Sequence, residues 1–77
     1  MNNKNNLSEA IRQRIKDLAK EKNLSIRKIS ILSGIPYSTI SSFLIKRCSS
    51  LTVATLYKIC EGLGVSIIDF FNDDLFN

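Results

Sequence analysis

Histidine and tryptophan are absent from this 77-residue chain, and cysteine, proline and glycine are scarce. Without histidine, the two cysteines Cys48 and Cys60 cannot complete a zinc site, and they are too few for the disulfide framework of a small secreted domain. Neither a Gly-rich phosphate loop nor a nucleophile with a base partner occurs. We therefore expect no metal, no cofactor and no enzymatic activity, and two reduced cysteines.

Long apolar runs are also missing. No segment approaches the roughly 18 consecutive apolar residues that span a bilayer, and the polar start MNNKNN lacks the apolar stretch of a signal peptide. These absences predict a cytoplasmic protein, associated with the nucleoid if it binds DNA, and without a membrane partner.

Charge is present but unevenly placed. All 11 lysines and arginines lie between Lys4 and Lys58, where only Glu9, Asp17 and Glu21 oppose them, and the other four acidic residues follow. The basic part suits a polyanion such as nucleic acid, although a solvated lysine-rich helix face would explain the same charge equally often.

Apolar residues recur at helical spacing in five segments, each bounded by residues that start or stop helices. Asn23, Gly34 and Gly64 are the expected stops, and Ser25, Thr52 and Ser66 are the expected N-caps. The expected helices are 7–22, 26–32, 36–45, a helix between Thr52 and Gly64, and 67–71.

No stretch alternates long enough to form a sheet, and 77 residues suffice for one modest core. We expect an all-α, compact five-helix domain over residues 7–72. A flexible segment, 1–6, would precede it, and a short acidic and apolar tail, 73–77, would follow it.

The segment 26–45 has the layout of a helix-turn-helix, because two short helices flank a turn that contains Gly34. Ser30, four residues before the glycine, is small enough for the two helices to cross closely there. The outer face of the second helix carries Tyr37 and several serines in place of the usual Glu and Lys. Such a polar face favours a binding role over a purely structural hairpin.

Three segments, IRQRIKDLAKEKNLSIRKIS, GIPYSTISSF and TLYKICEGLGVSIIDFF, resemble the Cro/C1-type, lambda-repressor-like helix-turn-helix family, also called the XRE family of bacterial and phage regulators. The resemblance covers nearly the whole chain and implies the five-helix fold that periodicity also predicts. It further implies a sequence-specific regulator of transcription, a repressor, that binds double-stranded DNA and places the helix at 36–45 in the major groove.

The resemblance implies roles for individual residues. The base-reading candidates are Tyr37, Ser38, Ser41 and Ser42. The phosphate-contacting candidates are Arg27, Lys28, Thr39, Lys46 and Arg47, together with the amides at the starts of the helices at 26 and 36. Because serine hydroxyls discriminate bases poorly, we expect specificity to come from Tyr37 against a thymine methyl, from water and from DNA shape.

The sequence departs from the family pattern at two places. Ile26 and Tyr37 stand where many members carry glutamine, and Leu44, Ile45 and Lys46 replace a Glu-x-Gly that usually follows the second helix of the motif. Ile26 cannot donate a side-chain hydrogen bond to a phosphate. These departures keep open an alternative function, a protein-binding module of antitoxin or antirepressor type with little DNA affinity and a regulatory protein as partner.

The end of the chain is rich in apolar residues. A small domain cannot bury all of them, so a homodimer contact is one expectation and a tail folded back over its own core is the equal alternative. The residues expected at the dimer contact are Phe70, Phe71, Leu75 and Phe76.

Overall fold

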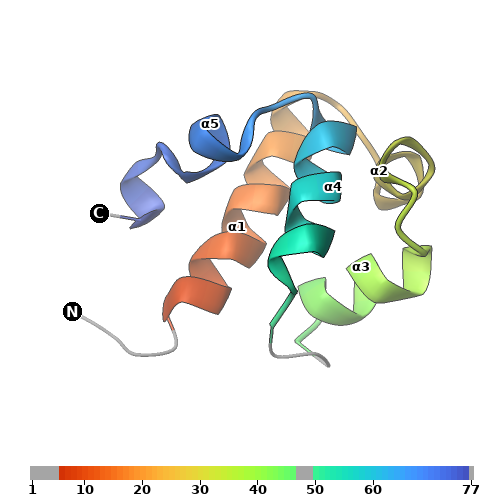
Figure 1. Ribbon diagram of the computed structural model, residues 1–77, viewed down its shortest axis with the longest axis horizontal. Coiled ribbons are helices and arrows are strands. Elements are labelled where there is room, and N and C mark those ends of the chain that lie inside the picture. Colours follow the sequence, from red (N-terminus) through yellow and green to blue (C-terminus); the bar gives the residue numbers. More distant parts are fainter. Residues whose placement is uncertain (1–5, 47–49, 77) are drawn as a thin grey trace.

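The computed structural model describes residues 6–46 and 50–76, which form helices and loops without a strand. In the view of Figure 1, α1 and α4 occupy the middle, with α2 and α3 on one flank and the end of the chain on the other. The elements are α1 (Asn6–Glu21), α2 (Ile26–Ser33), α3 (Tyr37–Leu44), α4 (Val53–Leu63), α5 (Ile67–Phe71) and the 3-10 helix η1 (Asp74–Phe76). The expected all-α five-helix fold is confirmed.

Local side chains and left-handed residues set the helix ends. Thr52 Oγ1 accepts a hydrogen bond from the Thr55 amide at 3.1 Å, and Ser66 Oγ accepts one from the Asp69 amide at 3.0 Å. Gly34 and Gly64 close α2 and α4 with φ angles of 75° and 78°, which glycine adopts without a Cβ penalty. Each of these ends falls within a residue or two of its expected position.

The core is built from one side of every helix, and its largest fully buried side chains come from α1 to α5. They are Ile15, Ile29, Ile40, Phe43, Ile59, Cys60, Leu63 and Phe70. This shared core fixes the orientation of α3, because its inward residues cannot leave without opening a cavity.

The seam between α2 and α4 is very close. A Cβ added at Gly62 of α4 would lie 3.0 Å from the Ser33 Cβ and 3.2 Å from the Ile29 carbonyl oxygen of α2. We expected a close crossing at Ser30, between α2 and α3. A close approach that we did not expect joins α2 to α4 through Gly62 and Ser33, which are 29 positions apart and have no local sequence signal in common.

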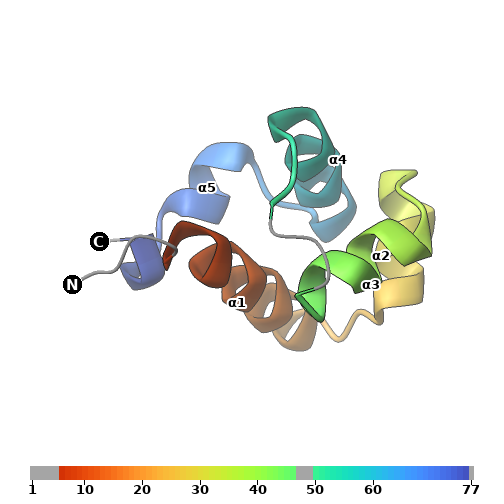
Figure 2. The same ribbon diagram turned by 90° about the horizontal axis from the view of Figure 1, so that it is seen from below.

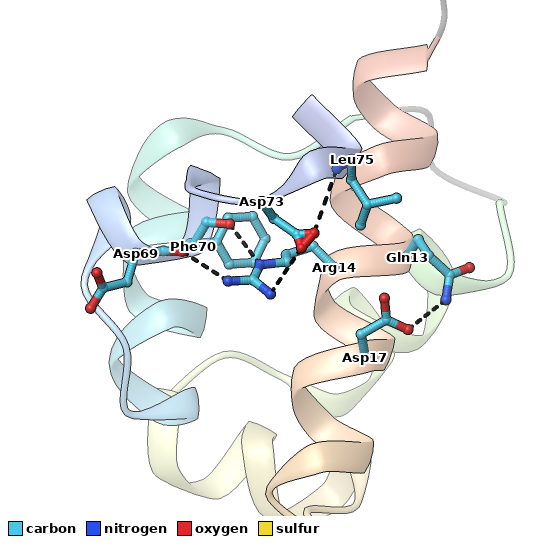
Figure 3. A network of polar contacts seen from close by, with 7 residues as sticks. All are labelled: Gln13, Arg14, Asp17, Asp69, Phe70, Asp73 and Leu75. Atoms are coloured by element: carbon cyan, nitrogen blue, oxygen red, sulfur yellow. Dashed lines mark hydrogen bonds and ion pairs between the residues drawn. The ribbon is translucent and has the colours of Figure 1, made fainter. Parts of the chain in front are cut away.

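The last residues fold back onto α1 (Figure 1). The Arg14 Nε donates to the Phe70 carbonyl oxygen at 2.7 Å, and its Nη2 donates to the Asp69 carbonyl oxygen at 2.8 Å. Its Nη1 pairs with Asp73 at 3.5 Å, as Figure 3 shows. Arg14 therefore anchors the end of the chain, and residues expected as a tail are packed there as η1.

This packing corrects one expected dimer residue. The side chain of Phe70 is 0% exposed, and its ring centroid lies 5.1 Å from that of Phe71 and 6.0 Å from that of Phe76. Phe70 has no surface to offer a partner, because the end of the chain and α1 enclose it. Phe71 and Phe76 are half-buried and Leu75 is exposed, so a dimer contact through these three residues stays a prediction.

Within residues 6–46 and 50–76, no helix combines the length and the apolar composition that a bilayer crossing requires. The same residues contain no group of three or more histidine, cysteine or acidic side chains arranged to hold a metal ion.

Candidate nucleic-acid interface

The turn between α2 and α3 is held by two serines of α2. The Ser30 hydroxyl donates to the Ile35 carbonyl oxygen at 2.6 Å, and the Ser33 hydroxyl accepts from the Ile35 amide at 3.2 Å. Ile35 is buried between them. The turn at Gly34, Ile35 and Pro36 is thus fixed by polar contacts on both sides, and it sets the direction in which α3 leaves.

The helix α3 presents two different faces. Ile40, Phe43 and Leu44 are buried in the core, whereas Tyr37, Ser38 and Thr39 are exposed at the N-terminal end. Ser41 and Ser42 are half-buried, so the more accessible hydroxyls lie in the first turn. Figure 2 shows α3 on the near side of the molecule, with α2 behind it. The first turn of α3 is therefore the part most accessible to a ligand.

Two candidates that we predicted for different roles lie together. The guanidinium carbon of Arg27 in α2 sits 5.3 Å from the centroid of the Tyr37 ring in α3. A cation over an aromatic face is attracted by the ring quadrupole, by about 0.5–1 kcal/mol at an exposed site. The contact places a positive charge and a flat ring next to each other at the start of α3.

The two helix N-termini differ in their hydrogen bonding. Ser25 caps α2, because its Oγ accepts from the Lys28 amide at 3.0 Å. Pro36 precedes α3 and supplies no side-chain cap. The Thr39 amide donates to the Pro36 carbonyl oxygen at 3.0 Å, so the amides of Tyr37 and Ser38 are the ones available to solvent or a ligand, and the positive end of the helix dipole favours an anion there.

At the other end of α3, the phosphate candidate Lys46 is exposed but takes part in an ion pair. Lys46 adopts a left-handed φ of 69°, and its Nζ lies 3.1 Å from the Glu9 carboxylate of α1. To bind a phosphate, Lys46 would have to leave Glu9. Arg47, the last candidate, lies outside the described residues.

One functional residue was missed by the sequence analysis. Arg12 is buried, its Nε donates to the Phe43 carbonyl oxygen at 2.7 Å, and its guanidinium carbon lies 4.6 Å from the Phe43 ring centroid. It also pairs with Glu9 at 3.3 Å. Arg12 therefore ties the second half of α3 to α1. The only hint in the sequence is that it lies three residues before Ile15, at the edge of the apolar stripe.

Internal ion pairs reduce the charge that remains for a ligand. Arg12, Arg14 and Lys46 pair with carboxylates of the same molecule. The other cations of the described segments form no ion pair and are exposed. They are Lys16, Lys20 and Lys22 near the end of α1, Arg27 and Lys28 in α2, and Lys58 in α4.

Comparison with models of known protein families gives a match. The family model of the Cro/C1-type HTH DNA-binding domain matches residues 14–74, which includes α2, the turn and α3. No curated protein and no solved structure matches the chain significantly. The matched range covers most of the chain and agrees with the helix-turn-helix geometry described above. The chain therefore belongs to the family of Cro/C1-type helix-turn-helix DNA-binding domains.

Proposed function

We propose that this DNA-binding regulator is a sequence-specific repressor that inserts α3 into the major groove of double-stranded DNA. The observation that carries the proposal is the first turn of α3, where exposed Tyr37 and Ser38 stand at an uncapped helix start beside Arg27. A helix N-terminus, a guanidinium and hydroxyl groups all favour contact with a polyanion. Repression requires only that the bound protein exclude polymerase from its operator.

Within this surface, Tyr37 and Ser38 are the leading base-reading candidates, and the half-buried Ser41 and Ser42 are secondary ones. Arg27, Lys28 and Thr39 are exposed around them and suit phosphate contacts. None of the base-reading side chains can make the bidentate pairing that arginine or glutamine makes with a base. The proposal therefore assigns specificity to ring contacts, to water and to DNA shape.

Salt dependence tests the DNA contact. Fluorescence anisotropy with a mixed-sequence duplex, at 50 and then 200 mM salt as rough settings, should show binding that weakens steeply, because each phosphate contact releases counterions. Three to five contacts correspond to a loss of roughly 50- to 500-fold over that interval. An affinity that hardly responds to salt, or no binding at all, would instead favour a protein-binding module with a regulatory protein as partner.

Selection from random duplexes tests the readout. We expect a short or degenerate consensus with A·T-rich, thymine-containing positions. Tyr37→Ala should reduce the preference for particular bases at these positions. Tyr37→Phe is the matched control, because it keeps the ring. A long consensus centred on guanines would contradict the proposed mode of reading.

We also propose that the protein binds as a homodimer, so that two copies of α3 reach half-sites about 34 Å apart. The exposed apolar residues at the end of the chain support this. Ile68 of α5 is 76% exposed, Leu75 is exposed as well, and Phe71 and Phe76 are half-buried.

Sedimentation of paired variants tests the dimer contact. Ile68→Asp should lower the apparent mass, whereas Val53→Asp should not. Val53 is the matched control, because it is 78% exposed on a different helix, α4. Equal apparent masses for both variants and the unmodified protein would show that α5 is not part of a dimer interface.

A further inference from the structure

An apolar groove of about 390 Å³ lies between the second half of α1, the start of α2 and the end of α3. Its floor is formed by core residues, including Ile15, Ile29 and Leu44. Ile45 lines it too and is 59% exposed. Apolar surface left in water costs about 25 cal/mol per Å², so an apolar occupant would be stabilised here.

Two lysines stand at this groove. Lys16 and Lys20 both line it and lie four residues apart on α1, which places them on one face of the helix. Neither forms an ion pair within the described segments. The groove therefore combines an apolar interior with unneutralised positive charge, a combination that selects an anion attached to an apolar body.

The groove also includes three of the five residues at which the sequence departs from the family pattern. Ile26, at the start of α2, lines it, and so do Leu44 and Ile45 at the end of α3. Ile26 stands where glutamine is usual and Leu44 where glutamate is usual, and with Ile45 they extend the apolar wall, whereas Tyr37 and Lys46 do not line the groove. Three of the departures from the family pattern thus contribute to one apolar surface.

We propose that this groove binds a small amphiphilic carboxylate of the medium-chain fatty acid class. Its hydrocarbon chain lies along the wall that Ile26 and Ile45 extend, and its carboxylate pairs with Lys16 and Lys20. The volume falls within the range of about 300–1,000 Å³ that is usual for small-molecule sites. The site does not require DNA binding. Because its wall includes the end of α3, however, ligand binding and DNA binding should influence each other reciprocally.

Three probes of equal chain length and different charge test the proposal. Octanoate, 1-octanol and octylammonium are titrated into the DNA-free protein while assigned methyl signals are followed by NMR. Octanoate should bind saturably with one molecule per chain and shift mainly the methyls of the groove. It should bind roughly three- to fivefold more tightly than octanol, as expected for an exposed ion pair, and octylammonium should bind most weakly.

Variants then separate charge from shape. Lys16→Ala combined with Lys20→Ala should reduce the affinity for octanoate to that for octanol, while Lys28→Ala with Lys58→Ala removes two other exposed lysines as the matched control. Ala19→Leu should weaken both ligands, because Ala19 lines the groove and leucine fills it with little loss of helix propensity. If Ala19→Leu fails to fold by circular dichroism, Ile45→Asp takes its place and should weaken octanoate more than octanol.

Four results would overturn the proposal. Octanol binding as tightly as octanoate would remove the role of the lysines. Methyl shifts spread over the whole surface would show nonspecific adsorption. Unchanged binding in a folded groove-filling variant would show that the ligand binds elsewhere. Absence of octanoate binding would show that the groove does not bind this class of ligand.

Discussion

Two arginines on α1 make nearly the same contacts with different parts of the molecule. Arg12 Nε donates to the Phe43 carbonyl oxygen at the end of α3, and Arg14 Nε donates to the Phe70 carbonyl oxygen in α5, both at 2.7 Å. Each also pairs with one carboxylate, at 3.3 and 3.5 Å respectively. One contact positions the proposed recognition helix, and the other holds the end of the chain.

The two contacts differ in burial and in the part of the molecule that each one holds in place. The Arg12 side chain is 7% exposed and packs on the Phe43 ring, whereas the Arg14 side chain is 16% exposed and holds a terminal segment. Loss of an internal helix opens the core, but loss of a terminal segment can remain local. The two arginine contacts have similar geometry, but they should contribute unequally to the stability of the fold. Neither arginine is free to bind DNA.

The largest expected effect is that of Arg12→Met. Methionine keeps much of the apolar bulk but removes the charged hydrogen bond to Phe43 and the contact with its ring, so we expect a loss of about 2–3 kcal/mol in the free energy of unfolding. Urea denaturation measures it. Gln13→Ala is the neighbouring control and should change stability by less than about 0.5 kcal/mol, because Gln13 is exposed. Equal losses in the two variants would contradict the structural role of Arg12.

A smaller effect is expected from Arg14→Met, about 1–2 kcal/mol, because the hydrogen bonds to Phe70 and Asp69 are partly open to water. Hydrogen exchange should show that protection is lost first at the amides of α5, while the amides of α3 remain protected. Arg12→Met should show the reverse order. The same pattern of exchange in both variants would mean that the two arginines do not hold separate parts of the molecule.

A third arginine, Arg27 of α2, is exposed, and its replacement tests the proposed contact with DNA. Arg27→Ala removes a cation that contacts Tyr37 but no buried group, so stability should change by less than about 1 kcal/mol. Duplex affinity should fall roughly tenfold and the salt slope should decrease by about one contact. Lys58→Ala on α4 is the control for simple loss of charge. If both variants weaken binding equally, only net charge matters, and the proposed orientation of α3 is wrong.

The sequence was sufficient for features that depend on near neighbours. The caps at Ser25, Thr52 and Ser66 and the left-handed ends at Gly34 and Gly64 all follow from residues a few positions apart, and the structure has them there. The family resemblance, which rested on three sequence segments, is confirmed over residues 14–74. Local rules therefore account for the order of helices and for the position of the turn.

Contacts between distant residues were not predictable in the same way. Arg12 and Arg14 looked like ordinary surface cations, because their carbonyl partners lie 31 and 56 positions away. The choice of Phe70 over Leu75 as the buried residue also depends on how the end of the chain meets α1. Both residues are apolar, so composition alone could not distinguish them. The fold could be predicted from the sequence. Predicting which charged side chains are available to a ligand required knowledge of how the helices pack.

The smallest expected effect concerns the buried thiol of Cys60. Desolvation by burial raises its pKa from 9.0 to about 11, and the positive charge of Arg14 opposes this rise. The folded pKa is above the unfolded one, so stability from the protonated thiol is complete below pH 9 and decreases as the pH rises toward 11. In a Cys48→Ser background, labelling by iodoacetamide should keep increasing up to about pH 11 in the folded protein, whereas labelling of the urea-unfolded chain levels off above about pH 9.

Adding Arg14→Met to that background sharpens the comparison between the two arginines. Removal of the nearby charge should move the folded labelling profile slightly to higher pH, because Arg14 no longer favours the thiolate. Arg12→Met should leave the position of the profile unchanged, since Arg12 does not contribute to this pKa, although faster unfolding would raise the labelling rate at every pH. A shift of equal size in both variants would show that the two arginines act through stability alone, and that the electrostatic link between Arg14 and Cys60 is absent.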